Sequence, residues 1–518
     1  MLRPLVAVTA AAVLLAGCSG GDDKKSDSPP GGDGTNASSS STPTPTVAEP
    51  QSFDPPKAFS VVAAVAEARP DGPTELDGGK AGMVGKTTLY ANRNGLAGIG
   101  IEGGPSWQVP AKEIASTKVE AYSRPMSVQL DGKEVIAMAY TQNVEAGGTQ
   151  KAHGQVVFQW IEPVEGKVLS TVSVDLGPVT SPGNTAAGLA STTYDATTGQ
   201  LAVGVGISAN GDAKKHDVVT VFADPTTKKG MAIPGIEAAG VLDGTVVGAK
   251  GESGEGSKAM SIVVADGTTG AIRKNTPVPT MNYLHVEGTG GKHAYLSGSG
   301  SVKDGKYDTD YLHSMYAVDL ASGALTETKL QRTEDGSFGF TCFSDHVTSL
   351  VCNGSGDRTA DGKDITEILA FDDATGKKSW GYTSVSGSRV VPSVTAVYNG
   401  YIYGKAETLP AVLDAKTGQD VPVPTPTPAP STGQTPTDGT SPTDGTSPTD
   451  GATPTDGTSP TDGSTPAPGS GTWGDLSLVY GDPVSPEAVS KYGSVYTLGA
   501  AGKSPGSEKI LVVQKAIA

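Results

Sequence analysis

Short apolar runs alternate with clusters of Gly, Asp and Asn along most of the chain from about residue 57 onward. A sustained 3.6-residue period is found only between Phe59 and Ala68, a Val/Ala-rich stretch that fits either a strand or a short helix. Short apolar runs bounded by turn-forming residues are typical of β-strands joined by tight turns. The pattern therefore predicts a protein that is mostly β.

One turn sequence, Asp-x-x-x-Gly, recurs between these strand-like runs. In such a turn the Asp carboxylate accepts a backbone N–H two residues on, and the Gly takes the positive φ that closes the hairpin. Looser versions begin at Glu162 and Asp224. The five full copies begin at Asp195, Asp266, Asp319, Asp372 and Asp414.

The spacing of the hairpins indicates a repeat architecture. Hairpins at residues 162, 224, 266, 319, 372 and 414 lie 42 to 62 residues apart, and each is preceded by an earlier hairpin. Repeats of about 40 to 50 residues with four strands apiece are the signature of β-propeller blades. First hairpins near residues 80, 130, 195, 243, 291, 345, 400 and 493 predict eight blades, with seven as the alternative.

The last predicted blade has three strands of its own, within Val489–Leu498 and Ile510–Val513. Propellers commonly close their ring by adding an N-terminal strand to the final blade. The apolar segment Ala58–Ala66 precedes the first full blade, and we expect it to supply this fourth strand, although a short helix remains the alternative.

One repeat carries a more specific resemblance. The segment from Ala370 to Gly376, followed by Trp380, resembles the A-x-D-x-x-T-G-x-x-x-W repeat of the pyrroloquinoline-quinone-like (quinoprotein-like) β-propellers. The resemblance extends over about residues 57–518 and implies a propeller in which the Trp staples neighbouring blades. Other copies lack the Trp, so apolar substitutes are expected there. Such repeats indicate a fold more reliably than an activity.

The first residues indicate export. Arg3 is followed by an apolar run from Leu5 to Ala16, about twelve residues, where a membrane-spanning helix needs roughly 20. The sequence Leu15-Ala16-Gly17-Cys18 resembles the lipobox of bacterial lipoproteins, in which the cysteine receives a diacylglycerol. We therefore expect a signal peptide over residues 1–17 and a lipid anchor on Cys18 at the extracytoplasmic face of the cell membrane. The alternative is a chance cysteine after an ordinary signal peptide.

Two segments are too polar to form a core. Residues 18–56 are rich in Ser, Thr, Pro and Gly, and residues 422–472 contain five in-register Pro-Thr-Asp-Gly copies. Such composition predicts disorder, as a tether and as an insertion within the propeller (residues 57–518). One carboxylate per six residues in a flexible chain cannot supply the six to eight oxygens of a calcium site, so O-glycosylation or spanning of cell-wall polymer is the favoured role of the insertion.

Charge excludes one class of partner. The chain has 38 basic and 55 acidic residues and a formal charge of −17. A phosphate backbone would be repelled by this excess of negative charge, so nucleic acid is not expected as a partner.

Cys342 and Cys352 remain once Cys18 is assigned to the lipid. They are symmetric about Val347 in a predicted hairpin, which sets them opposite each other on paired strands. Cross-strand Cα separations of about 4.5 to 5.5 Å fall within the range that a disulfide tolerates. An extracytoplasmic location permits the bond, and we predict a structural disulfide.

No catalytic, metal-binding or cofactor-binding set emerges. The six histidines do not share metal-ligand spacing on one element, although His285 and His293 are expected on adjacent strands. Quinoprotein dehydrogenases carry an adjacent Cys-Cys pair, which this sequence lacks. We therefore expect a non-enzymatic, lipid-anchored scaffold without a cofactor that binds a protein or small ligand. The alternatives are a sensor or solute-binding lipoprotein and a quinone-dependent or hydrolytic enzyme.

Overall fold

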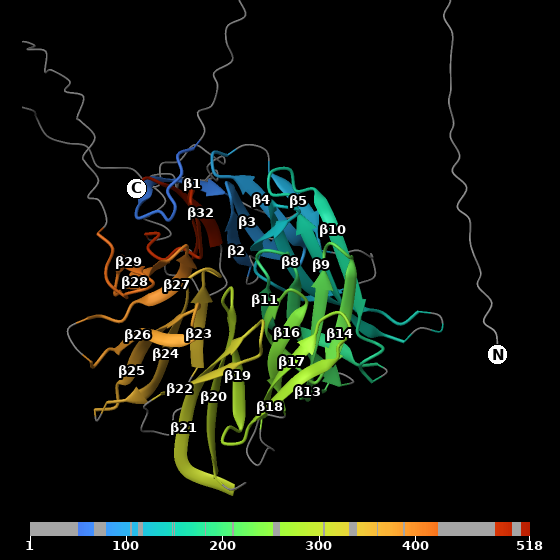
Figure 1. Ribbon diagram of the computed structural model, residues 1–518. Helices are drawn as coiled ribbons and strands as arrows, with labels where there is room; N and C mark the ends of the chain where they lie inside the picture. The colour runs from blue at the N-terminus through green and yellow to red at the C-terminus, as the bar shows by residue number, and fades with distance from the viewer. Residues whose placement is uncertain are drawn as a thin grey trace, which may run out of the picture. The chain divides into compact units, whose positions relative to one another are not determined.

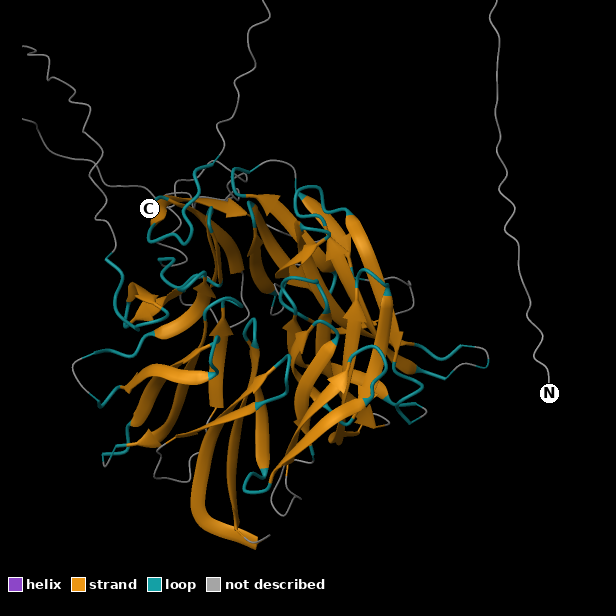
Figure 2. Cartoon of the chain, in the orientation of Figure 1, coloured by secondary structure: helices purple, strands orange, loops and turns teal. Residues whose placement is uncertain are grey.

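The structure is a computed structural model that describes residues 50–66, 79–103, 106–111, 118–147, 149, 151–181, 183–209, 212–251, 260–303, 306–330, 339–359, 361–386, 389–422, 482–499 and 509–518. The predicted signal peptide, Cys18, most of the predicted tether and all but the first residue of the predicted insertion lie outside these residues. Every regular element in the described residues is a β-strand (Figure 2).

The strands form eight separate sheets, which are the blades of a β-propeller. The prediction of eight blades is thereby confirmed. Blade 1 contains β2 (Lys80–Val84), β3 (Thr87–Asn92), β4 (Gly95–Gly100) and β5 (Trp107–Pro110). Blade 2 contains β6 (Lys118–Tyr122), β7 (Met126–Leu130), β8 (Lys133–Val144), β9 (His153–Ile161) and β10 (Val168–Asp175). Blade 3 contains β11 (Thr185–Tyr194), β12 (Leu201–Ala209), β13 (Asp212–Asp224) and β14 (Lys229–Pro234). Blade 4 contains β15 (Glu237–Leu242), β16 (Thr245–Lys250), β17 (Met260–Asp266) and β18 (Ile272–Val278).

The second half of the ring continues in the same way. Blade 5 contains β19 (Tyr283–Thr289), β20 (His293–Lys303), β21 (Lys306–Asp319) and β22 (Leu325–Leu330). Blade 6 contains β23 (Gly339–Ser344), β24 (Ser349–Arg358), β25 (Asp364–Asp372) and β26 (Lys377–Thr383). Blade 7 contains β27 (Ser393–Tyr398), β28 (Tyr401–Ala406) and β29 (Leu409–Asp414), with a single further bridge between Leu413 and Asp420. Blade 8 contains β30 (Ala488–Ser490), β31 (Gly493–Gly499), β32 (Lys509–Ala516) and β1 (Phe59–Ala66).

The blades follow one another around a common hub (Figure 1). An inner strand of each blade contacts an inner strand of the next: β2 contacts β7 of blade 2, the first strands of blades 2 to 8 contact one another in sequence, and β30 of blade 8 contacts β2 of blade 1. Within blade 8, β1 pairs with β32 at the outer edge, where Val65 lies opposite Val512. The expected closure by an N-terminal strand is therefore found, and the helical alternative for this segment is wrong.

The ordered region begins earlier than the expected boundary at residue 57. Residues from Pro50 onward belong to the same compact unit as the propeller. The side chain of Asn399 donates to Asp54 at 2.8 Å, and the Tyr403 hydroxyl donates to the Pro56 carbonyl at 2.7 Å. These bonds to blade 7 hold a segment whose composition alone predicts disorder.

The recurrent turns have the predicted chemistry. The carboxylate of Asp372 accepts the backbone N–H of Ala374 at 2.7 Å, and Gly376 has a φ of 66°. The looser turn that starts at Asp224 places Lys228 in the same left-handed region, at 55°. A carboxylate that satisfies two or three backbone donors makes such a turn rigid without any packing.

A hydrogen bond from each of several outer strands links neighbouring blades. The indole of Trp380 donates to the carbonyl of Ala415 in the next blade at 2.9 Å, and Trp107 donates to that of Pro163 at 3.1 Å. Ser170 and Lys274 occupy the same position as these tryptophans, four residues after a turn glycine. Ser170 donates to the carbonyl of Pro225, and Lys274 donates to the carbonyl of Gly323. The expectation of apolar substitutes is wrong here, because polar side chains replace the indole N–H as donors.

Candidate functional site

The hub has a cavity with a volume of about 770 Å³ at the end where the first strands turn into their hairpins. Inner strands from seven blades contribute to its wall, whereas none of the described lining residues comes from blade 4. The wall combines charged, polar and apolar side chains, including those of Lys80, Arg124, Thr192, Tyr194, Glu287, Cys342, Phe343, His346, Tyr398 and Lys491.

One side of the cavity is formed by a contact across the hub. The rings of Tyr194 in blade 3 and His346 in blade 6 have their centroids 4.0 Å apart, although two blades separate them along the ring. Burial lowers the pKa of His346 to about 4, so the imidazole is neutral at pH 7. In the described residues its Nδ1 atom is buried without a hydrogen-bond partner.

The turn that holds His346 is fixed by its neighbour Asp345. One carboxylate oxygen of Asp345 accepts the backbone N–H groups of Val347 and Thr348 at 2.9 and 2.7 Å. The other accepts the N–H of Gly400 in blade 7 at 2.7 Å. This carboxylate is thereby occupied by backbone donors and holds the His346 backbone in the left-handed region, at φ 56°.

Two cations lie together on the wall formed by blades 1 and 2. The ammonium of Lys80 donates to the Tyr122 carbonyl at 2.9 Å and lies over the Tyr122 ring, 5.5 Å from its centroid. Burial and the nearby Arg124 guanidinium lower the pKa of Lys80. Arg124 lies where Pro125, which lacks an N–H, separates β6 from β7 in the inner edge of blade 2.

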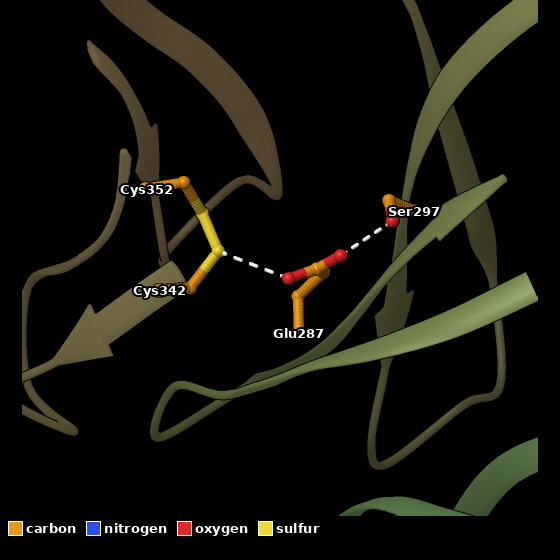
Figure 3. The surroundings of a disulfide bond; sticks show 4 residues. All are labelled: Glu287, Ser297, Cys342 and Cys352. Atoms are coloured by element: carbon orange, nitrogen blue, oxygen red, sulfur yellow. Dashed lines mark hydrogen bonds between the residues drawn. A yellow bond between two sulfur atoms is a disulfide. The ribbon is translucent and has the colours of Figure 1, made fainter. Parts of the chain in front are cut away.

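A carboxyl group lies on the wall formed by blade 5. Glu287 is on β19, and its Oε1 accepts a hydrogen bond from the Ser297 hydroxyl on β20 (Figure 3). Its Oε2 lies 3.5 Å from Sγ of Cys342. Burial raises the pKa of Glu287 to about 7, with the Ser297 hydrogen bond opposing. The group is therefore divided between its neutral and charged forms near neutral pH.

Cys342 and Cys352 lie opposite each other on β23 and β24, in the register that the sequence symmetry predicts. Their sulfur atoms are bonded, with the Cα atoms 4.0 Å apart. Cys352 is fully buried, whereas Cys342 faces the cavity. A disulfide sulfur carries no hydrogen, so its contact with Glu287 is a hydrogen bond only when the carboxyl is protonated and donates.

The histidines do not meet. His285 and His293 lie on the adjacent strands β19 and β20, as expected, but His293 is buried against the carbonyl of Asp373, with a ring nitrogen 2.7 Å from it. Within the described ranges, no group of three His, Cys, Asp or Glu residues has the arrangement of a metal site. Nor does any helix among these residues have the length and apolarity needed to cross a membrane.

Sequence reasoning identified the disulfide in this wall and missed the charged residues beside it. Lys80, Arg124 and Glu287 belong to no motif, and they come together only because the ring brings distant inner strands to one hub. The Arg124-Pro125 step inside a strand-like region is the one local signal that could have indicated an exposed inner residue.

Comparison with known proteins assigns the chain to no family. No model of a known protein family matches the chain, and no curated protein matches its sequence. Among solved structures, the β-propeller domain of the Trilobed protease from Pyrococcus furiosus is 12% identical over 59% of this chain and 83% of that one, with a TM-score of 0.33. The WD40 domain of SCAP from fission yeast is 8% identical over 65% and 85%, with a TM-score of 0.33.

A third similar structure is prolyl oligopeptidase B from Galerina marginata. It is 11% identical over 66% of this chain and 50% of that one, with a TM-score of 0.35. The chain thus spans half the length of that enzyme.

Proposed function

We propose that this protein is a non-enzymatic β-propeller lipoprotein that binds a ligand in its hub cavity. The lipid on Cys18 would hold it at the extracytoplasmic face of the membrane, and the ligand would be a small molecule or a short segment of a partner protein. The stapling of blades through Trp380 and Trp107 supports the resemblance to pyrroloquinoline-quinone-like propellers, in which the same residue type joins blades.

The cavity is the observation that carries this proposal. Its volume of about 770 Å³ lies in the range of roughly 300 to 1,000 Å³ that is usual for small-molecule sites. Its wall offers an apolar part and a few charged groups held by specific hydrogen bonds, which is the composition that fixes a ligand's orientation.

The test is ligand capture by the full-length protein. Small molecules and peptides are extracted from the culture medium of the cells that produce the protein. The extract is incubated with purified protein, and the retained compounds are identified by mass spectrometry. Thr192→Trp fills the cavity from the inner strand β11, and Thr171→Trp places the same side chain on the outermost strand of blade 2. Both threonines are half-buried, so the pair separates cavity filling from the general cost of a bulky residue.

We expect the native protein and Thr171→Trp to retain a common set of compounds that Thr192→Trp loses. Retention of the same compounds by all three proteins would place binding elsewhere and overturn the proposal. Chemical conversion of a retained compound during the incubation would contradict the non-enzymatic assignment and favour the hydrolytic or quinone-dependent alternative.

A further inference from the structure

We infer that the hub cavity is built for a zwitterionic peptide, with the anionic end at Lys80 and Arg124 and the ammonium end at Glu287. This inference rests on the proposed function and names the class of its ligand. It depends on three features: where the opposite charges lie in the ring, how little of each charge is neutralised by the protein, and what the remaining wall offers.

The charges lie on opposite walls. Lys80 belongs to blade 1, Arg124 follows the first inner strand of blade 2, and Glu287 belongs to blade 5. In a ring of eight blades, blades 1 and 5 are diametrically opposed. All three groups face the same cavity, and no ion pair joins either cation to the carboxyl among the described residues.

The two cations of blades 1 and 2 have no ion-pair partner among the described residues. In the described part of the chain, no Asp or Glu forms an ion pair with Lys80 or Arg124, and Arg124 acts on the ammonium as a like charge. Two like charges in a partly buried site disfavour each other, and an anion placed between them relieves that repulsion. A carboxylate suits both groups, because the guanidinium can bind it through two N–H donors.

No described cation forms an ion pair with Glu287 on blade 5. The described groups in contact with Glu287 are the Ser297 hydroxyl and the Cys342 sulfur, neither of which carries charge or titrates near neutral pH. A ligand ammonium near Oε2 would replace the proton that this oxygen otherwise needs in order to bond to the sulfur. Binding of the ammonium and release of the proton are thus coupled.

The other charged lining groups are already engaged within the wall. Asp345 binds backbone N–H groups, Glu134 accepts from the Ser127 hydroxyl at 2.7 Å, and Asp54 accepts from Asn399. Glu487 and Lys491 flank the same short strand of blade 8 and are of opposite charge, so they add no net charge to the wall. The donors to Asp345, Glu134 and Asp54 are uncharged, so these hydrogen bonds orient the carboxylates without offsetting their charge.

A peptide fits the remaining wall better than a single amino acid does. The cavity is large enough for a ligand of several residues, and side chains such as Met83, Phe343 and Tyr398 also line it. Polar groups such as Thr192 and Ser490 are interspersed with them and can bond to a peptide backbone. Both ends of a short peptide carry the charges that the opposite walls lack.

The experiment uses three pools of tripeptides of the same sequences: one with free ends, one N-acetylated and one C-amidated. Binding to the full-length protein is measured by affinity selection and titration calorimetry. We expect the free pool to bind at least about tenfold more tightly than either blocked pool, as expected for the loss of a charged hydrogen bond. Affinity for the free pool should rise from pH 5.5 to pH 7.5, because Glu287 must lose its proton to accept the ammonium.

Three variants test which wall binds each end of the peptide. Glu287→Gln should bind free and N-acetylated pools equally and lose the pH dependence. Lys80→Met should reduce the preference for the free pool over the C-amidated pool, and the double variant Lys80→Met with Arg124→Met should abolish it. Glu165→Gln and Lys229→Met, at exposed positions on the turn and outer strand of blades 2 and 3, should leave the discrimination intact.

Equal affinity of the native protein for all three pools, or binding of none of them, would overturn the zwitterion inference. If the extract experiment still yields compounds that Thr192→Trp loses, the proposed binding function stands and only the ligand class fails. If both experiments are negative, the proposed function fails as well.

Discussion

The indole of Trp107 lies directly over Gly166 of the next blade, so close that a Cβ added at residue 166 would be 2.4 Å from the ring. The same relationship links Trp380 to Gly418, with 2.7 Å to the ring. The turn glycine therefore serves two purposes: its φ of 71° closes the hairpin of its own blade, and its missing side chain makes room for the Trp of the preceding one.

This double role predicts an unequal cost for two similar substitutions. Gly166 and Gly132 have nearly the same φ, 71° and 72°, but an added Cβ at 132 meets nothing within 4 Å. Gly132→Ala should cost only the backbone strain, about 1 to 2 kcal/mol. Gly166→Ala should cost a further ~1 to 3 kcal/mol, because Trp107 must move. Urea unfolding midpoints measure the difference, and equal losses would show that the indole does not stabilise the blade contact.

Glu287 and His346 should affect the pH dependence of the free energy of unfolding in opposite directions. The pKa of Glu287 is raised to about 7, so the folded protein binds more protons than the unfolded chain between about pH 4.5 and 7. Its contribution is present at low pH and falls as pH rises through that window. The pKa of His346 is lowered to about 4, so its effect has the opposite sign, and stability rises between about pH 4 and 6.5.

Removing each group in turn should therefore change the pH dependence of stability in opposite directions. Relative to the native protein, Glu287→Gln should become more stable by about 2 kcal/mol as pH increases from 4.5 to 7, taking about 1.4 kcal/mol per pKa unit with a discount for partial exposure. His346→Asn, which keeps a residue that tolerates positive φ, should show a relative loss over about pH 4 to 6.5. Unfolding midpoints at a series of pH values measure both curves, and parallel curves for all three proteins would contradict the burial of these groups.

The disulfide should stabilise blade 6 by constraining the unfolded chain. A bridge between residues ten apart in sequence contributes ~2 to 3 kcal/mol in the chain-entropy estimate. The double variant Cys342→Ser with Cys352→Ser should have a free energy of unfolding lower by that amount, and its urea midpoint should fall accordingly. Non-reducing digestion followed by mass spectrometry should find one linked peptide pair, and two alkylatable thiols in protein purified without reductant would contradict the bond.

Anchoring at Cys18 remains a prediction from the sequence. Cys18→Ser removes the thiol that the lipid would occupy, so the variant should move from the membrane fraction to the soluble fraction. Cell fractionation with an antibody to the propeller measures the shift. An unchanged distribution would mean that the membrane association, if present, has another cause.

The sequence predicts those parts of this molecule that local chemistry determines. The Asp-x-x-x-Gly turns, the blade count and the opposition of Cys342 and Cys352 all follow from turn spacing and from the symmetry of one hairpin. The donors Ser170 and Lys274 could have been found too, since each lies four residues after a turn glycine, as Trp380 does.

The hub could not be predicted in this way. Which side chains face it depends on how eight inner strands are oriented about one axis, and alternation along a strand buried on both faces does not distinguish hub from blade contact. Lys80 and Glu287 are separated by more than two hundred residues, and only ring closure sets them across one cavity. The Tyr194–His346 contact likewise depends on the packing of four blades, and no local pattern marks it.

The pairing of β1 with β32 also sets the order in which the ring can be completed during synthesis. β1 precedes every other described strand and its partner β32 follows them, so β1 must stay unpaired while every blade between them forms. Until β32 emerges, both β1 and the outer side of β31 present unpaired backbone groups to other chains. Loss of even the last ten residues would leave seven finished blades around an open seam, with two exposed strand edges available for association between molecules.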